Sequence, residues 1–303
     1  MPGYLALLGL LLYGLLAVYA ERKIAAWIQD RLGPTETGPY GLLQTFADLL
    51  KLLRKSEAVP EEAVRDTFRA APLLSFAALA ASLTWLPFLQ PASSSEFGLW
   101  LASLTLILQA ATLFLGGWAS GSKYALLGAY RLLGLVLAYE LMVSLLLLTL
   151  LTHYGTFSLA AIAAQQKDTW GLFQSPFLLG AAGAWLWTAL LTAHRAPFDL
   201  PETESELVAG ALTEYSGIRF ALFMLSEYGV MLLQGLWFGY GLLGGHGWLG
   251  ALLVVSLLLI VRWAWPRWRP DQVLTLAWTQ GIPLTFSLWI GELLWQRFIG
   301  KSF

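Results

Sequence analysis

The chain has 303 residues, of which 57% are hydrophobic and only 12% charged, and it contains 15 Trp. This composition, with its positive mean hydropathy, is typical of an integral membrane protein, and the net charge of −1 does not favour nucleic acid or an acidic lipid surface as the main partner. There is no Cys, which excludes disulfides, thiolate zinc sites and iron–sulfur ligation by this chain, so any redox centre must belong to a partner.

Apolar runs recur along the whole chain and predict membrane-spanning helices of about 20 residues each. The first run, from Tyr4 to Tyr19, lacks a basic n-region and a small-residue cleavage site, so we interpret it as a span rather than a signal peptide. The sequence therefore predicts an all-α protein with a single transmembrane domain over residues 1–303. The eight predicted spans are 3–20, 71–89, 99–119, 132–154, 176–194, 217–241, 247–265 and 272–298.

The positive charges are distributed unevenly among the links between these spans. Of the 18 Lys and Arg, 15 lie in or beside the links that follow the first, third, fifth and seventh spans. Because positively charged loops resist translocation, these links are predicted to be cytoplasmic and both termini to lie outside. They include the longest link, residues 21–70, and an acidic loop, residues 195–216.

The long link contains a segment with helical periodicity, GLLQTFADLLKLLRK, at residues 41–55. Its apolar and polar positions alternate at steps of three and four, with Leu42, Leu43, Phe46, Leu49, Leu50 and Leu53 on one face and Gln44, Asp48, Lys51 and Lys55 on the other. This pattern predicts an amphipathic helix along the cytoplasmic interface. The pattern leaves open whether the helix only anchors the loop to lipid or also lines a cavity opening or docks a partner.

Some patterns near the span ends carry little functional information. Residues 239–244 spell G-x-G-x-x-G, but no strand precedes them and no acidic residue follows about 20 positions later, so we predict a turn. Gly235 and Gly239 form a small-xxx-small pair suited to close helix packing. The histidines are spread along the chain without metal-ligand spacing and are interpreted as interfacial side chains: His153, His194 and His246.

Two acidic residues, Glu140 and Glu227, lie inside predicted spans. An ionised carboxylate at bilayer depth costs several kcal/mol unless it is paired or hydrated, so neither is expected to face lipid. One interpretation is a buried ion pair with an arginine. The candidates for that arginine are Arg131, Arg219 and Arg262.

The other interpretation is a relay of carboxylates that includes the acidic loop. If residues 202–214 are helical, Glu202 and Glu206 share a face and Glu214 lies two turns further along it. Carboxylates crowded together away from water hold protons more tightly, because like charges and desolvation both penalise ionisation. Such a chain of glutamates is suited to passing protons or charge.

Four stretches give the chain a resemblance to a known family. They are ERKIAAWIQDRLGPTETGPYGLLQTFADLLKLLRK (21–55), SKYALLGAYR…AYE (122–140), RAPFDLPETESELVAGALTEYSGIRFALFMLSEY (195–228) and RWAWPRWRPDQ (262–272). From its first span to its last, the chain resembles the H subunit of NADH:quinone oxidoreductase, respiratory complex I. The resemblance implies a multi-pass subunit of the bacterial inner membrane, at the junction between the hydrophilic electron-transfer arm and the proton pumps.

The resemblance also implies roles for individual residues. Positions that line or support the quinone passage are Arg22, Arg31, Asp48, Lys51, Arg195, Phe198 and Asp199. Positions on the acidic path that couples quinone reduction to proton pumping are Glu140, Glu202, Glu204, Glu206, Glu214 and Glu227. Quinone is then the substrate, and flavin and iron–sulfur clusters are expected in partner subunits rather than in this chain. The expected partners are the quinone-site and terminal iron–sulfur subunits of the arm and small membrane subunits.

The sequence departs from the family pattern in one loop. The family usually has Gly-Pro-Asn-Arg-x-Gly-Pro where residues 33–39 read GPTETGP, so a basic position is occupied by Glu36. It usually has Lys-Glu-Asp where residues 55–57 read KSE. These differences leave open the contacts of that loop and the identity of its partner or quinone. Because the sequence does not show which soluble arm docks, a related membrane subunit of an energy-converting hydrogenase or of a complex with another electron donor also stays open. An independent transporter would instead show inverted repeats and broken helices, which the sequence does not display.

Overall fold

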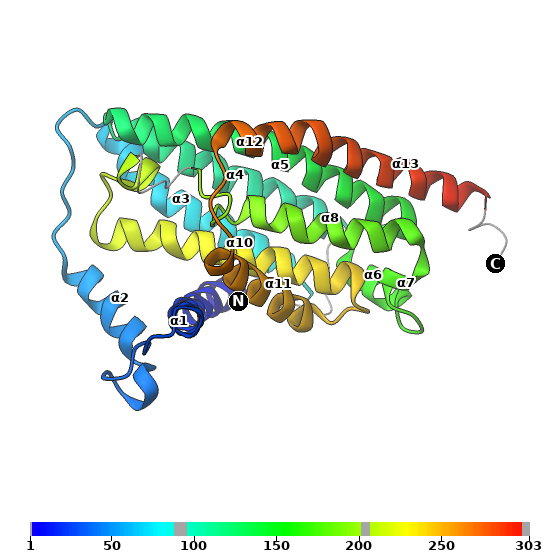
Figure 1. The fold of residues 1–303 in the computed structure, drawn as a ribbon, viewed down its shortest axis with the longest axis horizontal. Coiled ribbons are helices and arrows are strands. Elements are labelled where there is room, and N and C mark those ends of the chain that lie inside the picture. The colour runs from blue at the N-terminus through cyan, green and yellow to red at the C-terminus, as the bar shows by residue number, and fades with distance from the viewer. Residues whose placement is uncertain (1, 88–95, 201–206, 299–303) are drawn as a thin grey trace.

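The computed structural model describes residues 2–87, 96–200 and 207–298, and the regular secondary structure in these ranges is helical (Figure 1). The prediction of an all-α fold is confirmed. The main helices are α1 (Pro2–Ile28), α2 (Gln44–Arg54), α3 (Arg65–Thr84), α4 (Gly98–Ala119), α5 (Lys123–Tyr154), α8 (Pro176–Thr192), α10 (Gly217–Leu242), α11 (Gly247–Ala264) and α13 (Ile282–Phe298). Shorter elements are η1 (Pro39–Gly41), α6 (Leu159–Gln165), α7 (Gly171–Gln174), η2 (Gly210–Leu212), α12 (Pro270–Leu276) and the π-helical turn η3 (Ala277–Gly281).

Each predicted span coincides with a helix over most of its length. In the described part of the chain, six helices are long and apolar enough to cross a membrane: α3, α4, α5, α10, α11 and the continuous helix Pro270–Phe298 formed by α12, η3 and α13. α8 is a shorter apolar helix, and α1 ends in the charged sequence Glu21-Arg22-Lys23 followed by a short apolar turn. The protein is therefore an integral membrane protein, while the number of crossings and their orientation stay predictions.

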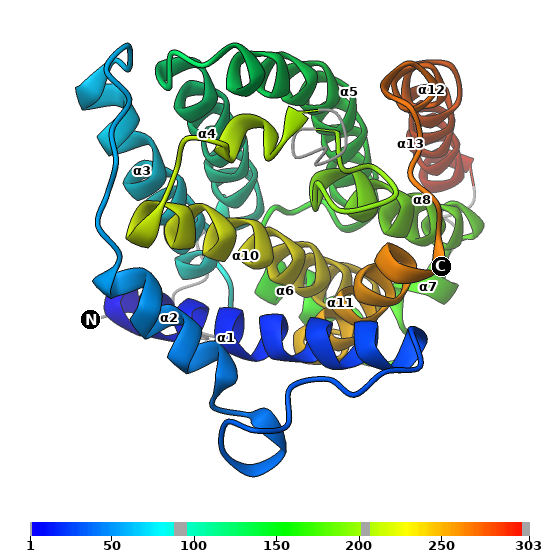
Figure 2. The same ribbon diagram turned by 60° about the vertical axis from the view of Figure 1, so that its left-hand side comes forward.

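Helix α10 occupies the centre of the bundle, between α1 on one side and α4 and α5 on the other (Figure 2). Every residue from Leu225 to Leu242 is buried. Small residues permit this close packing, because a Cβ atom added to Gly235 would lie only 2.5 Å from Ala251 Cα of α11. Gly239 similarly packs against Gly247, so the small-xxx-small pair predicted from the sequence is confirmed as a helix contact.

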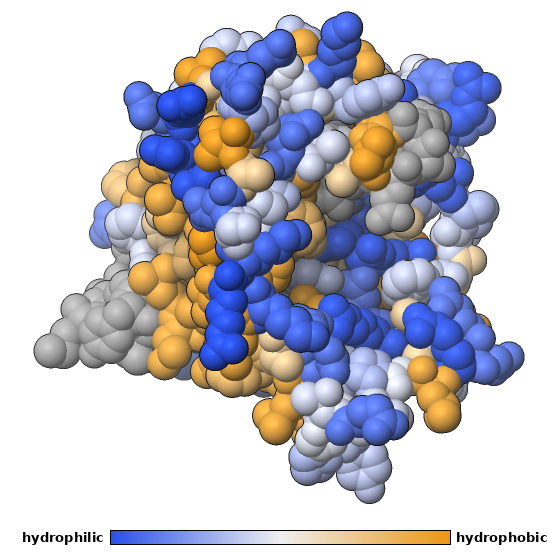
Figure 3. Space-filling view, turned by 90° about the vertical axis from the view of Figure 1, so that its left-hand side faces the viewer, coloured by the Kyte–Doolittle hydropathy of each residue, from blue (hydrophilic) through white to orange (hydrophobic). Residues whose placement is uncertain are grey.

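Helix α2 lies at one end of the bundle, against α1 and α10 (Figure 1). Its apolar side is largely exposed, with Leu43, Phe46, Leu50 and Leu53 each 42–54% accessible, as expected for a helix that faces lipid or a partner. Figure 3 views the molecule from this end, where hydrophilic residues cover much of the surface. The link after α2 is held by the ion pair between Arg219 and Glu57, at 2.6 Å.

The acidic loop differs from its predicted conformation. A continuous helix over 202–214 is wrong for the described residues 207–214, because Val208 (φ 65°) and Gly210 (φ 53°) adopt left-handed backbone conformations that interrupt an α-helix. The chain then turns through η2, and Tyr215 donates to Phe68 O or Gly116 O, both at 3.2 Å. Burial raises the pKa of this phenol, which keeps it a neutral donor. Three acids of this loop lie outside the described residues: Glu202, Glu204 and Glu206.

Candidate functional site

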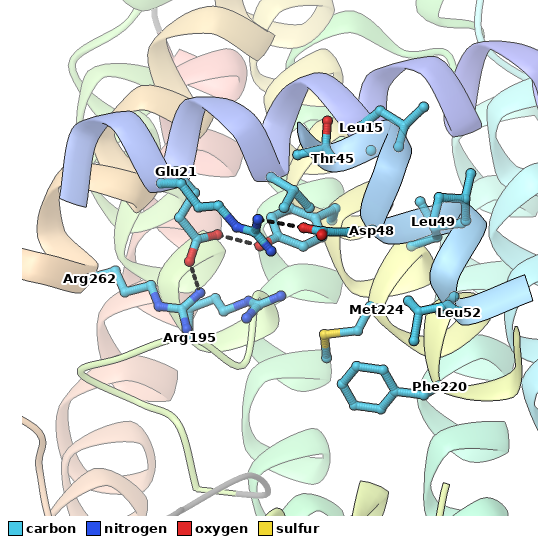
Figure 4. A pocket seen from close by; sticks show the side chains of 16 residues that line it. Leu15, Glu21, Thr45, Asp48, Leu49, Leu52, Arg195, Phe220, Met224 and Arg262 are labelled. Carbon is cyan, nitrogen blue, oxygen red and sulfur yellow. Dashed lines mark hydrogen bonds and ion pairs between the residues drawn. The ribbon is translucent and has the colours of Figure 1, made fainter. Parts of the chain in front are cut away.

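A cavity of about 300 Å³ lies between α1, α2 and α10 (Figure 4). One part of its wall is apolar and the other carries charged and phenolic groups. The apolar part is formed mainly by Leu15, Val18, Leu49, Leu52, Phe220, Met224 and Leu225. The polar part is formed by Glu21, Arg22, Asp48, Arg195, Tyr228 and Arg262.

Helical periodicity explains how three separate segments line one cavity. The cavity residues of each helix recur at steps of three and four, which places them on one face. In α1 the stripe runs from Gly14 to Arg22, in α2 from Thr45 to Leu52, and in α10 from Phe220 to Tyr228. The exposed apolar residues of α2 lie on a different face, so this helix lines a cavity as well as presenting an apolar surface.

The carboxylate of Glu21 organises the inner, polar part of the cavity. It accepts hydrogen bonds from the Tyr228 hydroxyl and from Arg262 Nη1, and its side chain is only 8% exposed. Nearer the solvent, Arg22 Nη1 lies 2.5 Å from Asp48 Oδ2, with the two side chains 44% and 28% exposed. The more exposed pair contributes little to stability, whereas the buried network fixes the side chains around the cavity.

Arg195 connects this cavity to a buried acid on α10. Its guanidinium lies 4.6 Å from the centre of the Tyr228 ring, and its Nη2 is 3.3 Å from Glu227 Oε2. Both partners of the ion pair are almost fully buried, and breaking a buried ion pair by removing one partner costs about 3–5 kcal/mol. Arg195 follows α8, in the irregular segment that includes the cis Ala196–Pro197 peptide.

The expectation of a buried ion pair is thus met for Glu227, but with a different partner. Arg262 instead contacts Glu21, and Arg219 contacts Glu57. Arg195 was predicted to belong to the quinone passage and Glu227 to the acidic path. The two residues form one ion pair, because the segment after α8 returns to the side of α10. The sequence does not show this proximity, since Arg195 and Glu227 lie in different elements.

The structure gathers some of the residues that the resemblance assigned to the passage and separates others. Three line the cavity: Arg22, Asp48 and Arg195. Arg31 donates to Gln29 at 2.7 Å on the surface, and Lys51 lies on the exposed side of α2. Phe198 is 4% exposed and packs edge-on against Trp268, while Asp199 pairs with Arg267 at 2.5 Å. These four positions do not line the cavity.

Glu140 and Glu214 also lie outside the cavity wall. Glu140 is half-buried on α5, and its buried Oε1 has no hydrogen-bond partner in the part of the chain that the structure describes. The neighbouring Tyr139 ring lies 5.6 Å from the ring of His194, which directly precedes Arg195. Glu214 follows η2 and is half-buried.

Three charged or phenolic residues of the cavity wall were not identified as site residues from the sequence: Glu21, Tyr228 and Arg262. Glu21 and Tyr228 extend the helical stripes that carry Val18 and Met224, so periodicity within α1 and α10 is a signal that points to them. Arg262 lies 241 positions from the carboxylate that it contacts, and no local pattern indicates that contact.

The fold and this site define a class of protein: a multi-helix membrane protein with a partly apolar cavity that ends in a buried network of ions. Residues 3–291 match the sequence model of the NADH dehydrogenase family, and the chain belongs to that family. It is 36% identical to the NADH-quinone oxidoreductase H subunit 2 of Cytophaga hutchinsonii, over 94% of this chain and 96% of the relative.

Other relatives carry closely related names. The chain is 38% identical to the NADH-quinone oxidoreductase H subunit of Geobacillus kaustophilus, over 90% of this chain and 85% of the relative. It is 37% identical to the protein of the same name from Anoxybacillus flavithermus, over 97% and 92% of the two chains. The similarity therefore extends over nearly the full length of the fold.

Proposed function

We propose that this chain is a membrane subunit of a proton-translocating NADH:quinone oxidoreductase, in which the α1–α2–α10 cavity admits quinone and the buried acids couple its reduction to proton pumping. The observation that carries the proposal is the cavity itself, with an apolar wall and an inner end where Arg195 contacts both Tyr228 and Glu227. The names of the relatives support the choice of NADH and quinone as reactants.

The chemistry of a quinone matches the two parts of the wall. Its ring and tail are apolar and suit Val18, Leu52 and Phe220, while its carbonyl oxygens accept hydrogen bonds from groups such as the Arg195 guanidinium. Reduction to quinol adds two electrons and two protons. The electrons come from a redox centre in a partner subunit, because this chain has no Cys to hold an iron–sulfur cluster.

Coupling to the acids follows from the position of Arg195. Negative charge on a quinone oxygen attracts the guanidinium, and two unit charges about 4 Å apart interact by about 4 kcal/mol at an effective dielectric constant near 20. That attraction competes with the contact between Arg195 and Glu227. Glu227, once less compensated, takes up a proton, and Glu140 and the acids of residues 202–214 provide further sites for its transfer.

Blocking the cavity tests the proposal. Leu52→Trp places a larger side chain in the cavity wall, whereas Leu53→Trp places the same group on the exposed side of α2 and serves as the matched control. We expect Leu52→Trp to lower quinone-dependent NADH oxidation by about tenfold or more, since misplacement by about 1 Å has effects of that size. Electron transfer from NADH to a water-soluble acceptor should be unchanged in both variants.

The outcome that contradicts the proposal is equally direct. If assembled complexes with Leu52→Trp reduce long-tailed and short-tailed quinones at the rates of the Leu53→Trp control, quinone does not use this cavity. Identification of the subunits that co-purify in mild detergent would show whether the electron donor is NADH.

A further inference from the structure

A second buried polar cluster lies at the end of the bundle opposite the cavity. Figure 1 shows α2 and α7 at opposite ends of the molecule, and this cluster is formed where α5, α7, α8 and α13 meet. Its centre is Glu292 of α13, whose side chain is fully buried. No step of the proposed quinone chemistry uses it. A buried carboxylate at this depth needs a physical explanation, because its solvation must be replaced by specific partners.

Three elements supply those partners. Ser175, the N-cap of α8, donates its hydroxyl hydrogen to Glu292 Oε2. Gln296 Nε2 lies 3.0 Å from Glu292 Oε1. His153, near the end of α5, places Nδ1 2.7 Å from the same Oε1. The carboxylate therefore fastens α13 to α5 and to the start of α8.

The hydrogen bonds around His153 determine where protons must lie. Its other nitrogen, Nε2, is 2.9 Å from Gln174 Oε1. The amide of Gln174 is oriented by its nitrogen, which donates to Thr169 O at 3.0 Å, so the oxygen that faces the ring is an acceptor. Nε2 therefore carries a hydrogen, and a neutral imidazole would have a lone pair on Nδ1.

That lone pair would face a carboxylate oxygen at hydrogen-bond distance. The contact between Nδ1 and Oε1 is favourable only if one proton lies between them, whether it belongs to the ring or to the carboxyl group. The amide of Gln296 lies 2.8 Å from Nδ1, but it also donates to Oε1 and does not remove the repulsion between the two acceptors. Loss of the proton therefore weakens the junction between α5 and α13.

The surrounding titratable groups do not supply an alternative counter-charge. Tyr154 on α5 presents its ring edge-on to His153 with ring centres 4.7 Å apart, and its hydroxyl has no hydrogen-bond partner among the described residues. Arg297, the other charged residue of α13, is exposed, and α7 and the start of α8 contribute the neutral Gln174 and Ser175. The His153 side chain is 12% exposed, so the pair is not completely enclosed by the protein.

We propose that His153 and Glu292 form a one-proton site that holds the end of α13 against α5, with the proton taken from the aqueous phase at the end of the bundle opposite the cavity. Proton binding and the docking of α13 are then reciprocally coupled: the proton stabilises the docked helix, and the docked helix retains the proton. The sign follows directly. Docking is strongest while the pair holds one proton, and it weakens as the pH rises and that shared proton is lost.

Hydrogen–deuterium exchange of the assembled complex in nanodiscs tests this site without reference to quinone turnover. Protection factors for peptides from residues 282–298, corrected for the intrinsic rate at each pH, would be compared at about pH 5.5 and about pH 8.5, one value on each side of neutrality. We expect protection of α13 to fall by about tenfold at the higher pH, the size expected from losing a hydrogen bond to a charged group. Peptides from α4 should show no such fall.

Two variants complete the test. Glu292→Gln supplies amide hydrogens that donate to a neutral Nδ1, so α13 should remain protected at both pH values. His246→Gln is the matched control, because His246 lies at the same end but its ring packs against the Trp170 ring, and this variant should behave as the unmodified protein. Equal protection of α13 at both pH values in the unmodified protein would overturn the proposal, as would retention of the pH dependence in Glu292→Gln.

Discussion

At the scale of single residues, the two carboxylates that the sequence placed within the membrane have different surroundings. Glu227 is compensated by Arg195 at 3.3 Å, whereas the buried oxygen of Glu140 has no hydrogen-bond partner in the described part of the chain. Charge removal therefore has different consequences at the two sites. Removing the charge of a carboxylate that belongs to an ion pair takes this contact away from a buried cation. Removing the charge of a carboxylate outside such a pair does not.

For Glu227, we expect Glu227→Gln to reduce assembly of the complex, because the variant breaks the buried ion pair with Arg195, at a cost of about 3–5 kcal/mol. The double variant Arg195→Gln and Glu227→Gln should restore assembly but not quinone-dependent turnover. Native gel electrophoresis and NADH oxidation assays measure the two effects separately. Normal assembly of the single variant would mean that the ion pair does not stabilise the fold.

For Glu140, we expect Glu140→Gln to assemble normally, because the amide preserves the shape of the side chain and removes a charge with few compensating contacts. Quinone-coupled proton translocation should fall strongly, while electron transfer from NADH to a water-soluble acceptor is unchanged. A pH-sensitive dye in proteoliposomes reports the translocation. Wild-type pumping by the assembled variant would refute a relay through this residue.

At the scale of elements, the connection between α11 and α12 holds the segment that carries Arg195. Arg267 pairs with Asp199 at 2.5 Å, and Trp268 N donates to Pro197 O at 3.1 Å. The Trp268 ring also packs edge-on against Phe198, with ring centres 6.1 Å apart. Through these contacts, residues outside the cavity wall hold the segment that carries Arg195.

Loss of the Arg267 contact should therefore loosen this segment. We expect Arg267→Ala to raise the apparent KM for quinone and to lower turnover. The double variant Arg267→Asp and Asp199→Arg exchanges the two charges of the pair and should restore both quantities. Arg269→Ala is the matched control, because Arg269 lies two positions away in a pair with Asp271 that is 77% and 64% exposed. Equal kinetics for Arg267→Ala and Arg269→Ala would show that the connection does not position Arg195.

At the scale of the whole molecule, the charged cavity and the His153–Glu292 cluster occupy opposite ends of one bundle. The distribution of Lys and Arg predicts that the cavity end is cytoplasmic. The exposed residues Ala58 and Asp168 lie in links that this distribution assigns to opposite sides of the membrane.

Sided labelling measures this orientation. The chain has no Cys of its own, so Ala58→Cys and Asp168→Cys each introduce one thiol into it. We expect an impermeant maleimide to label Ala58→Cys only from the cytoplasmic side and Asp168→Cys only from the other side. Labelling of both positions from the same side would overturn the predicted topology.

The sequence by itself determined the class of fold, the positions of its helices and one face of the site. The length of each apolar run specifies where a helix forms in a membrane, because the backbone N–H and C=O groups must form their hydrogen bonds within the segment. The periodicity of the residues specifies which side chains share a face of that helix. Both are local properties of the chain. The assignment of Arg22 and Asp48 to a quinone passage came instead from the resemblance to a family, and it stays a prediction.

Only the tertiary structure decided which charges meet. Glu21 contacts Arg262 across 241 positions, and Arg195 reaches Glu227 because an irregular segment folds back beside α10. Likewise, no sequence pattern joins His153 to Glu292 across 139 positions. Ion pairing depends on distances of a few ångströms between side chains, and those distances are set by how the helices pack, which no single stretch of sequence contains.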